Sequence, residues 1–218
     1  MAKVSKEPKP KWSEALLRLK FGLQSVNNNS TLLTEWLDVQ NDLLDSEKAI
    51  LEELRLELID NVAFWNEEEL KVYFLGAVLK MANYQNETLF RPFLDRKISS
   101  VVEGISLKTK PDFMISKGLG DVYSAPYFCF HEYKRKKNNA DDPVAQVLVA
   151  MLIAQEENKN DKPIYGCYVM GAAWYFMIMQ GKKYAQMTVP LTATDENDIQ
   201  KTLLILRKFK VILENQLT

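Results

Sequence analysis

Apolar residues recur at helical spacing through the first third of the chain. Residues 12–23 carry leucines every three to four positions, which predicts an amphipathic helix. A polar block at 25–30 interrupts this pattern. Residues 31–60 are rich in Leu and Glu and contain no Pro or Gly, which predicts one or two further amphipathic helices. Another helix is predicted over 66–83, with Asn66 as its N-cap.

After Tyr84 the pattern changes to alternating apolar and polar positions with β-branched residues, which is typical of strands. Strands are predicted over 90–93 and 98–105, over 105–115, and, after a loop at 116–121, over 127–134. Asp142 and Pro143 predict the N-cap and first position of a helix that ends near 157. Three more strands (163–170, 174–180 and 184–189) and a final amphipathic helix (195–216) follow. This order predicts an α/β fold, a mixed β-sheet flanked by helices with an N-terminal helical extension.

Length and composition fit one domain with an attached helical segment. The 218 residues are 47% hydrophobic and 26% charged, which is close to globular averages. We divide the chain into a flexible tail (1–11), a helical N-terminal extension (12–60) and the main domain (61–218). The leucine-rich N-terminal helices either pack on the core or form a homodimer interface, and the pattern does not choose between them.

Charge and cysteine content exclude several functional classes. A formal net charge of −1 argues against coating nucleic acid by bulk charge, although it leaves room for a local basic cleft. The N-terminus lacks an apolar secretory segment, and the longest apolar run, 147–154, is far shorter than the roughly 20 residues of a membrane span. We therefore expect a cytoplasmic protein. With Cys129, Cys167 and one histidine, a zinc site lacks ligands, and both thiols are expected to be buried.

Two acids and a lysine stand at strand positions from which their side chains can meet. Residues two apart on a strand share a face, so Glu132 and Lys134 point one way while His131 and Tyr133 point the other. If Asp112 lies on the neighbouring strand, its carboxylate can approach that of Glu132. His131 is expected to be structural, because it faces away from both charged groups.

An exposed ion pair at a sheet edge is the simpler interpretation of Glu132 and Lys134, and such a pair contributes little stability. Both residues, however, are expected to share a strand face with Phe128 and Phe130, and such a face should be apolar and packed. Burying charges on such a face is costly unless they are paired or functional. The pattern thus favours a functional site.

The expected chemistry is that of a hydrolytic metal site. Asp112, Glu132 and the backbone carbonyl of Tyr133 supply hard oxygen ligands for Mg²⁺, with water at the remaining positions and Mn²⁺ as a substitute. The metal would activate a water molecule and neutralise charge on a phosphate. Lys134 would orient or deprotonate that water, or stabilise the phosphate in the transition state.

Two more residues are candidates for a supporting role. Gln146 falls one turn into the helix that follows Lys134, so its amide could position the lysine or the water. Glu67 begins a helix in which positions 67, 70, 74, 77 and 81 share one face, so it is expected to face the sheet. Glu68 is the alternative to Glu67, because helix starts are uncertain by about one residue.

The set of Pro111-Asp112, Glu132-Tyr133-Lys134, downstream Gln146 and upstream Glu67 resembles the PD-(D/E)XK nuclease superfamily over residues 66–180. Within it, Leu75, Leu79 and Asn83-Tyr84 are similar to the start of the nuclease domain of type I restriction motor subunits. The resemblance implies a restriction-endonuclease-like core, in which Asp112 and Glu132 bind metal, Lys134 is catalytic, and Gln146 and Glu67 assist. Residues 1–60 fall outside it.

A Mg²⁺-dependent nuclease acting on nucleic acid, with DNA as the expected substrate, is therefore the leading functional prediction. Lys110, Arg135, Lys136 and Lys137 would bind backbone phosphates beside the metal, although a basic run of this kind is equally consistent with a solvated loop. The alternative function is a non-catalytic nucleic-acid- or protein-binding module with the same fold. The acidic net charge favours that alternative.

Overall fold

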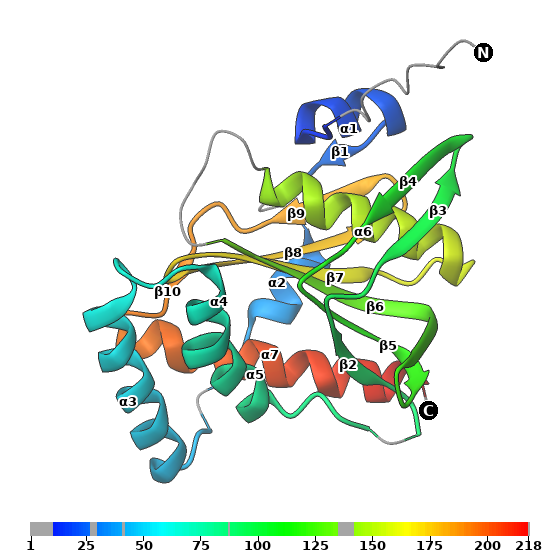
Figure 1. Cartoon of the computed structure of the whole chain (residues 1–218). Helices are drawn as coiled ribbons and strands as arrows, with labels where there is room; N and C mark the ends of the chain where they lie inside the picture. Colours follow the sequence, from blue (N-terminus) through cyan, green and yellow to red (C-terminus); the bar gives the residue numbers. More distant parts are fainter. Residues whose placement is uncertain (1–10, 27–29, 41, 87, 135–141, 218) are drawn as a thin grey trace, which may run out of the picture.

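A mixed β-sheet with helices on both faces forms the centre of the molecule (Figure 1). The computed structural model describes residues 11–26, 30–40, 42–86, 88–134 and 142–217. The strand order in the sheet is β1 (Gln24–Ser25), β9 (Lys183–Gln186), β8 (Ala173–Gln180), β7 (Ile164–Met170), β6 (Val122–Lys134), β5 (Phe113–Leu119) and β2 (Arg91–Leu94), with β10 (Leu191–Thr192) paired to β8. Two pairs, β1 with β9 and β6 with β7, are parallel, and the others are antiparallel.

Helices cover one face of the sheet, and helices together with a hairpin cover the other. The first face packs against α2 (Thr31–Leu37), α3 (Asp45–Asn61), the stretch α4 (Glu67–Glu69), η2 (Leu70–Leu75) and α5 (Gly76–Ala82), and α7 (Glu196–Leu217). The second face packs against α1 (Glu14–Phe21), α6 (Pro143–Asn158) and the separate hairpin of β3 (Ile98–Val102) and β4 (Ile105–Thr109). The predicted α/β architecture, with helices preceding the sheet, is confirmed.

The N-terminal helices contribute side chains to the same hydrophobic cluster as the sheet. Trp36 of α2 contacts the rings of Tyr165, Phe176 and Phe209, and its indole nitrogen donates to the Ile205 carbonyl oxygen at 3.1 Å. Of the two arrangements considered for these helices, packing on the core is the one observed. No helix among the described residues is long and apolar enough to cross a lipid bilayer.

Several predicted boundaries were wrong. Residues 105–115 do not form one strand, because β4 pairs with β3 while β5 pairs with β6 and β2. The break between them places residues 110–112 outside both strands. The predicted loop at 116–121 is mostly strand, and β6 begins at Val122 rather than at 127.

A β-bulge between β5 and β6 changes the face on which Phe128 lies. Ile115 is opposite Cys129 but Ser116 is opposite Tyr127, so Phe128 is the additional residue on β6. Phe128 consequently packs with Phe90 in the first cluster, while Phe130 belongs to the second. The prediction that Phe128 and Phe130 share a face was therefore wrong.

A π-helical segment, η2, interrupts the helix that carries Glu67. The Gly76 N–H donates to the Lys71 carbonyl oxygen, a bond that spans one residue more than an α-helical bond. The buried stripe therefore changes phase: Leu70 and Phe74 are buried as predicted, but Val78 and Ala82 are buried in place of the predicted Ala77 and Met81.

Candidate active site

Strand register brings Asp112 and Glu132 to the same place in the sheet. Asp112 directly precedes β5, whose first residue, Phe113, is opposite His131 on β6, so the next position along each strand pairs Asp112 with Glu132. The Asp112 carbonyl oxygen accepts from the Asp95 N–H at 3.1 Å, which fixes the backbone here. Asp112, directly before β5, and Glu132 on β6 thus lie next to each other at this end of the two strands, although Asp112 was predicted to lie within a strand.

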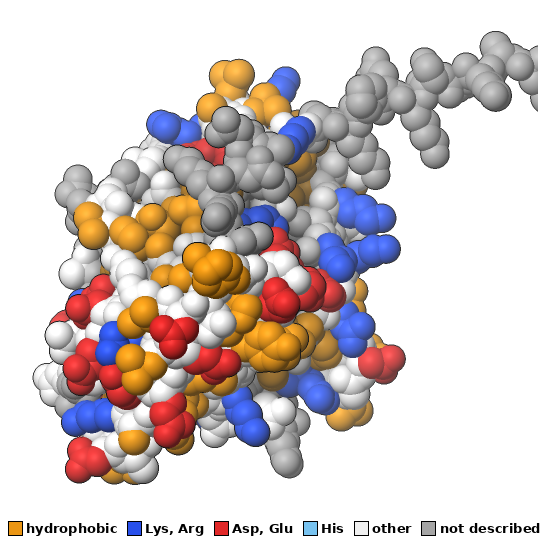
Figure 2. Space-filling model, turned by 60° about the vertical axis from the view of Figure 1, so that its left-hand side comes forward, with side chains coloured by type: hydrophobic (Ala, Val, Ile, Leu, Met, Phe, Trp, Pro, Cys, Tyr) orange, Lys and Arg blue, Asp and Glu red, His pale blue; other side chains and the backbone are white. Residues whose placement is uncertain are grey.

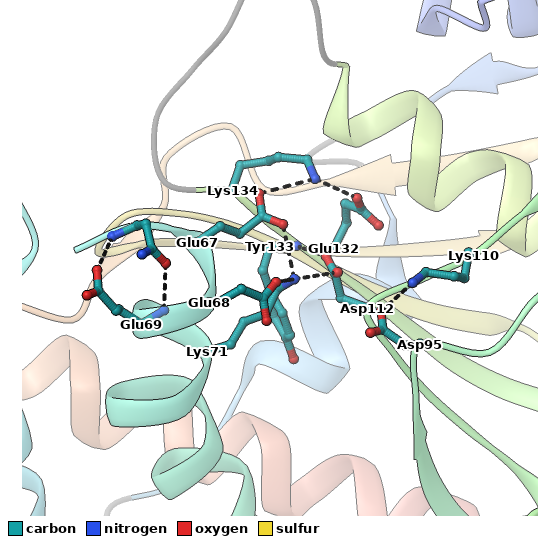
Figure 3. A network of polar contacts seen from close by, with 11 residues as sticks. Glu67, Glu68, Glu69, Lys71, Asp95, Lys110, Asp112, Glu132, Tyr133 and Lys134 are labelled. Carbon is teal, nitrogen blue, oxygen red and sulfur yellow. Dashed lines mark hydrogen bonds and ion pairs between the residues drawn. The ribbon is translucent and has the colours of Figure 1, made fainter.

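Both carboxylate oxygens of Asp112 accept hydrogen bonds (Figure 3). The Tyr133 N–H donates to Oδ2 and the Lys71 ammonium donates to Oδ1, each at 2.8 Å. Only 11% of the Asp112 side chain is exposed. Because the N–H and C=O of one strand residue point to the same edge, the Tyr133 carbonyl also faces the edge at which Asp112 lies.

Glu132 and Lys134 form a buried ion pair on one face of β6, as the alternation predicted. Glu132 Oε1 and Lys134 Nζ are 2.9 Å apart, and only 7% and 16% of the two side chains are exposed. Burial, followed by the charge of Asp112, raises the pKa of Glu132 to about 7, although Lys134 acts in the opposite direction. Burial and the neighbouring Asp112 thus outweigh the stabilisation that Lys134 gives to the charged form of Glu132.

Lys134 is held in its charged form. Burial lowers the pKa of its ammonium, but the charge and hydrogen bond of Glu132, and the charges of Glu67 and Asp112, outweigh burial and raise the pKa above its ordinary value. Glu67 Oε2 lies 3.6 Å from Lys134 Nζ. At neutral pH, without a metal, Lys134 is therefore a donor of hydrogen bonds and positive charge.

Glu67 reaches the site, as predicted, and its partner there was missed by the sequence analysis. Lys71 Nζ lies 3.0 Å from Glu67 Oε1, 3.0 Å from Glu68 Oε1 and 2.8 Å from Asp112 Oδ1. Burial lowers the pKa of Lys71, but the three carboxylates outweigh burial and hold the pKa above its ordinary value. The sequence signal that could have revealed this partner is the position of a lysine one helical turn after Glu67.

His131 takes no part in this network. It lies on the opposite face of β6, where its Nδ1 and the Tyr133 hydroxyl are 2.9 Å apart, and its ring packs on Phe113. Burial lowers the pKa of His131 to about 3, so the imidazole is neutral. These contacts agree with the predicted structural role.

The structure places Gln146 outside the acid and lysine network. It lines a separate pocket of about 210 Å³ together with Trp12, Lys108 and Thr109. Its side-chain oxygen is buried and accepts no hydrogen bond from the described residues. The predicted contact of Gln146 with Lys134 is absent from the polar contacts of the described residues.

The predicted phosphate-binding residues are only partly described. Lys110 forms an ion pair with Asp95 at 3.1 Å, and both side chains are about half exposed. Arg135, Lys136 and Lys137 lie outside the described residues. In the space-filling view, acidic and hydrophobic side chains are interspersed over the face shown, and Lys and Arg side chains gather at its right-hand edge (Figure 2).

The donor set suits a hard divalent cation. The available ligands are the carboxylates of Asp112 and Glu132 and the Tyr133 carbonyl, all oxygen atoms of the kind that Mg²⁺ prefers. Within the part of the chain that the structure describes, no three His, Cys, Asp or Glu side chains form a metal-binding group, so the carbonyl and water must complete such a site.

The charges around this donor set also suit a divalent cation. The network contains the four carboxylates of Glu67, Glu68, Asp112 and Glu132 and the two ammonium groups of Lys71 and Lys134. When all six groups are ionised, two negative charges remain uncompensated. One Mg²⁺ would balance them.

No protein-family model matches the chain, and no curated protein matches it. A function for the chain must therefore be argued from the site itself.

Proposed function

We propose that this protein is a Mg²⁺-dependent nuclease of the PD-(D/E)XK superfamily that hydrolyses phosphodiester bonds of nucleic acid, with DNA as the expected substrate. One observation carries the proposal: Asp112, directly before β5, and Glu132 and Lys134 on β6 lie in a single, largely buried network. A purely structural ion pair needs only one acid and one base. Here two acids from separate elements converge, and the network contains more carboxylates than ammonium groups.

Asp112, Glu132 and the Tyr133 carbonyl would hold the metal. When bound, Mg²⁺ supplies positive charge that neutralises the phosphate and favours deprotonation of the attacking water. The Tyr133 N–H already fixes Asp112 Oδ2 at 2.8 Å, so the orientation of that carboxylate does not depend on the metal. A bound cation would lower the raised pKa of Glu132 and so favour its charged form.

Lys134 would act as a charged donor to the phosphate or to the water. Its raised pKa favours this charged form. Glu67, 3.6 Å away, would keep the ammonium near the site if Glu132 were engaged by a metal. Glu67 is thus a positioning residue that acts through Lys134.

The alternative is a protein- or nucleic-acid-binding module without catalysis, and two observations favour it. Lys71 and Lys134 already neutralise one oxygen each of Asp112 and Glu132 without a metal. Beside the acids, Phe64, Val72 and Tyr73 expose half or more of their surface, as an interaction site would.

Cleavage assays separate the two functions. We would incubate the full chain with supercoiled plasmid, single-stranded DNA and RNA in Mg²⁺, Mn²⁺ or EDTA. The nuclease function requires metal-dependent cleavage that is lost in both Asp112→Asn and Lys134→Met. Asp95→Asn is the matched control, because Asp95 is largely exposed and pairs only with Lys110 among the ion pairs of this region.

The outcomes are distinct. Cleavage that persists in Asp112→Asn and Lys134→Met at the wild-type rate would indicate a contaminant and reject the proposal. Absence of cleavage on all substrates, combined with retained nucleic-acid or protein binding, would establish the non-catalytic module instead.

A further inference from the structure

Lys71 occupies the side of Asp112 on which a metal would bind. Its ammonium lies 2.8 Å from Asp112 Oδ1, while Oδ2 is taken by the Tyr133 N–H. Only 19% of the Lys71 side chain is exposed, so the ammonium is enclosed by the carboxylates around it. Both oxygens of Asp112 therefore already accept a hydrogen bond, and a metal ion on Oδ1 would have to share that oxygen with the Lys71 ammonium.

A divalent cation and the Lys71 ammonium would repel each other if both contacted Asp112 Oδ1. Mg²⁺ binds carboxylate oxygens at about 2.0–2.1 Å, and at that distance it would lie close to an ammonium that contacts the same oxygen. Their charges repel strongly in a site largely shielded from water. Metal binding at Asp112 Oδ1 would therefore be favoured if Lys71 moved away from that oxygen.

Lys71 has other partners to receive it. Glu67 Oε1 and Glu68 Oε1 each lie 3.0 Å from Nζ, on the helical stretch that carries Lys71 itself. The ammonium can leave Asp112 and remain paired with both. Release from Asp112 therefore does not expose an unpaired charge.

The helix geometry at Lys71 is a second, independent observation. Lys71 lies in η2, where its carbonyl accepts from Gly76 rather than from the residue an α-helix would use. Single π-helical turns are frequent at functional sites. The residue whose carbonyl accepts the π-type bond here is also the lysine that reaches Asp112, 41 positions away.

We propose that Lys71 is a tethered cation that competes with the divalent metal for Asp112 and thereby sets the metal affinity of the site. This inference rests on the proposed nuclease function. In the absence of metal, Lys71 neutralises and orients Asp112. Metal occupancy requires transfer of the ammonium to Glu67 and Glu68.

Isothermal titration of Mg²⁺ into the full-length protein tests this competition. Lys71→Met should bind Mg²⁺ at least about tenfold more tightly than wild type, because a competing charge-assisted hydrogen bond is removed. Lys71→Arg should retain the weak affinity of wild type. Lys80→Met is the matched control, since Lys80 is an exposed lysine on the following helix, and its affinity should equal that of wild type.

Lys71→Gln is the second variant, for use if Lys71→Met does not fold. It removes the charge but keeps a hydrogen-bond donor for Asp112, and it should also tighten Mg²⁺ binding. Tighter binding in Lys71→Met or Lys71→Gln supports the competition, even if wild type shows no measurable binding. Equal affinities in wild type and both variants, with binding abolished by Asp112→Asn, would overturn the role of Lys71 while the metal site stands. No Mg²⁺ binding by any of these proteins would overturn the proposed nuclease function as well.

Discussion

At the scale of single residues, the site is defined by an imbalance of buried charge. Glu132 pairs with Lys134 at 2.9 Å, yet burial and Asp112 still raise its pKa to about 7. A carboxyl group in this position is protonated more easily in the folded protein than in the unfolded chain. Folding therefore takes up a proton between the ordinary pKa of Glu132 and its folded value.

This linkage predicts how stability depends on pH. Between pH 4.5 and about pH 7 the folded state binds more protons than the unfolded state at Glu132, so its contribution to stability falls as pH rises through that window. Above pH 7 the contribution of Glu132 to the free energy of unfolding should have fallen by about 3 kcal/mol. Urea unfolding of wild type and Glu132→Gln in EDTA, at pH 5 and pH 8, measures it as the difference between the two proteins.

Relative to Glu132→Gln, wild type should be less stable at pH 8 than at pH 5. A stability difference that does not change with pH would show that Glu132 titrates normally. Burial and the charge of Asp112 would then have no net effect on the pKa of Glu132.

The alternation of side chains along one strand was sufficient to predict which face Glu132, Lys134 and His131 each lie on, because it depends only on local backbone geometry. Lys71 could not be placed in the same way. Its contact with Asp112 joins residues 41 positions apart, so it depends on how the helix packs against the sheet and not on the local sequence pattern. The supporting role of Gln146 failed for a related reason, since the position of α6 over the sheet decides where its first turn points.

At the scale of elements, single extra residues account for the main differences from the sequence-based expectations. The bulge on β6 moves Phe128 to the other face, and the π-helical turn shifts the buried stripe from Ala77 to Val78. Both depend on the partner element against which the strand or helix packs. The capping signals were local, and they predicted the starts of α4 and α6 correctly.

The cap of α6 also joins two distant elements. Asp142 Oδ1 accepts from the Ala145 N–H, and Oδ2 accepts from the Glu14 N–H at the start of α1, both at 2.9 Å. Asp142→Ala should lower the free energy of unfolding by about 1–2 kcal/mol, as expected for a lost N-cap. Asp142→Asn keeps one acceptor oxygen for Ala145 but loses the second, so its effect should be smaller.

Urea denaturation of the two Asp142 variants tests this division. Equal losses in Asp142→Ala and Asp142→Asn would show that the bond to Glu14, rather than the cap of α6, provides the stabilisation.

At the scale of the whole molecule, two hydrophobic clusters on opposite faces of the sheet hold the site between them. The α/β class could be predicted from the change in periodicity near Tyr84. The strand order and the assignment of helices to faces could not, because they follow from pairings between distant segments. One example of close packing is Gly166 on β7, where a Cβ would lie 2.5 Å from Met151 and 2.7 Å from Val147 of α6.

Trp36 links the N-terminal helices to the core and tests whether they unfold with it. It is 1% exposed and contacts aromatic rings from β7, β8 and α7. Trp36→Ala should destabilise the protein by about 3–5 kcal/mol in a single cooperative transition. Trp36→Phe, which loses the indole bond to Ile205 but keeps an aromatic ring, should cost less. A separate early transition in wild type would show that α2 is an independent unit.

The central claim is that Asp112, Glu132 and Lys134 form a metal-dependent site for phosphodiester hydrolysis. Its most direct test is the single-turnover rate of plasmid cleavage in Mg²⁺ by wild type, Asp112→Asn and the Asp95→Asn control. We predict that Asp112→Asn lowers the rate by at least about 100-fold, a typical loss for removal of a catalytic group, that EDTA abolishes cleavage, and that Asp95→Asn retains the wild-type rate. Equal, metal-independent rates in all three proteins, or no cleavage by wild type, would contradict the claim.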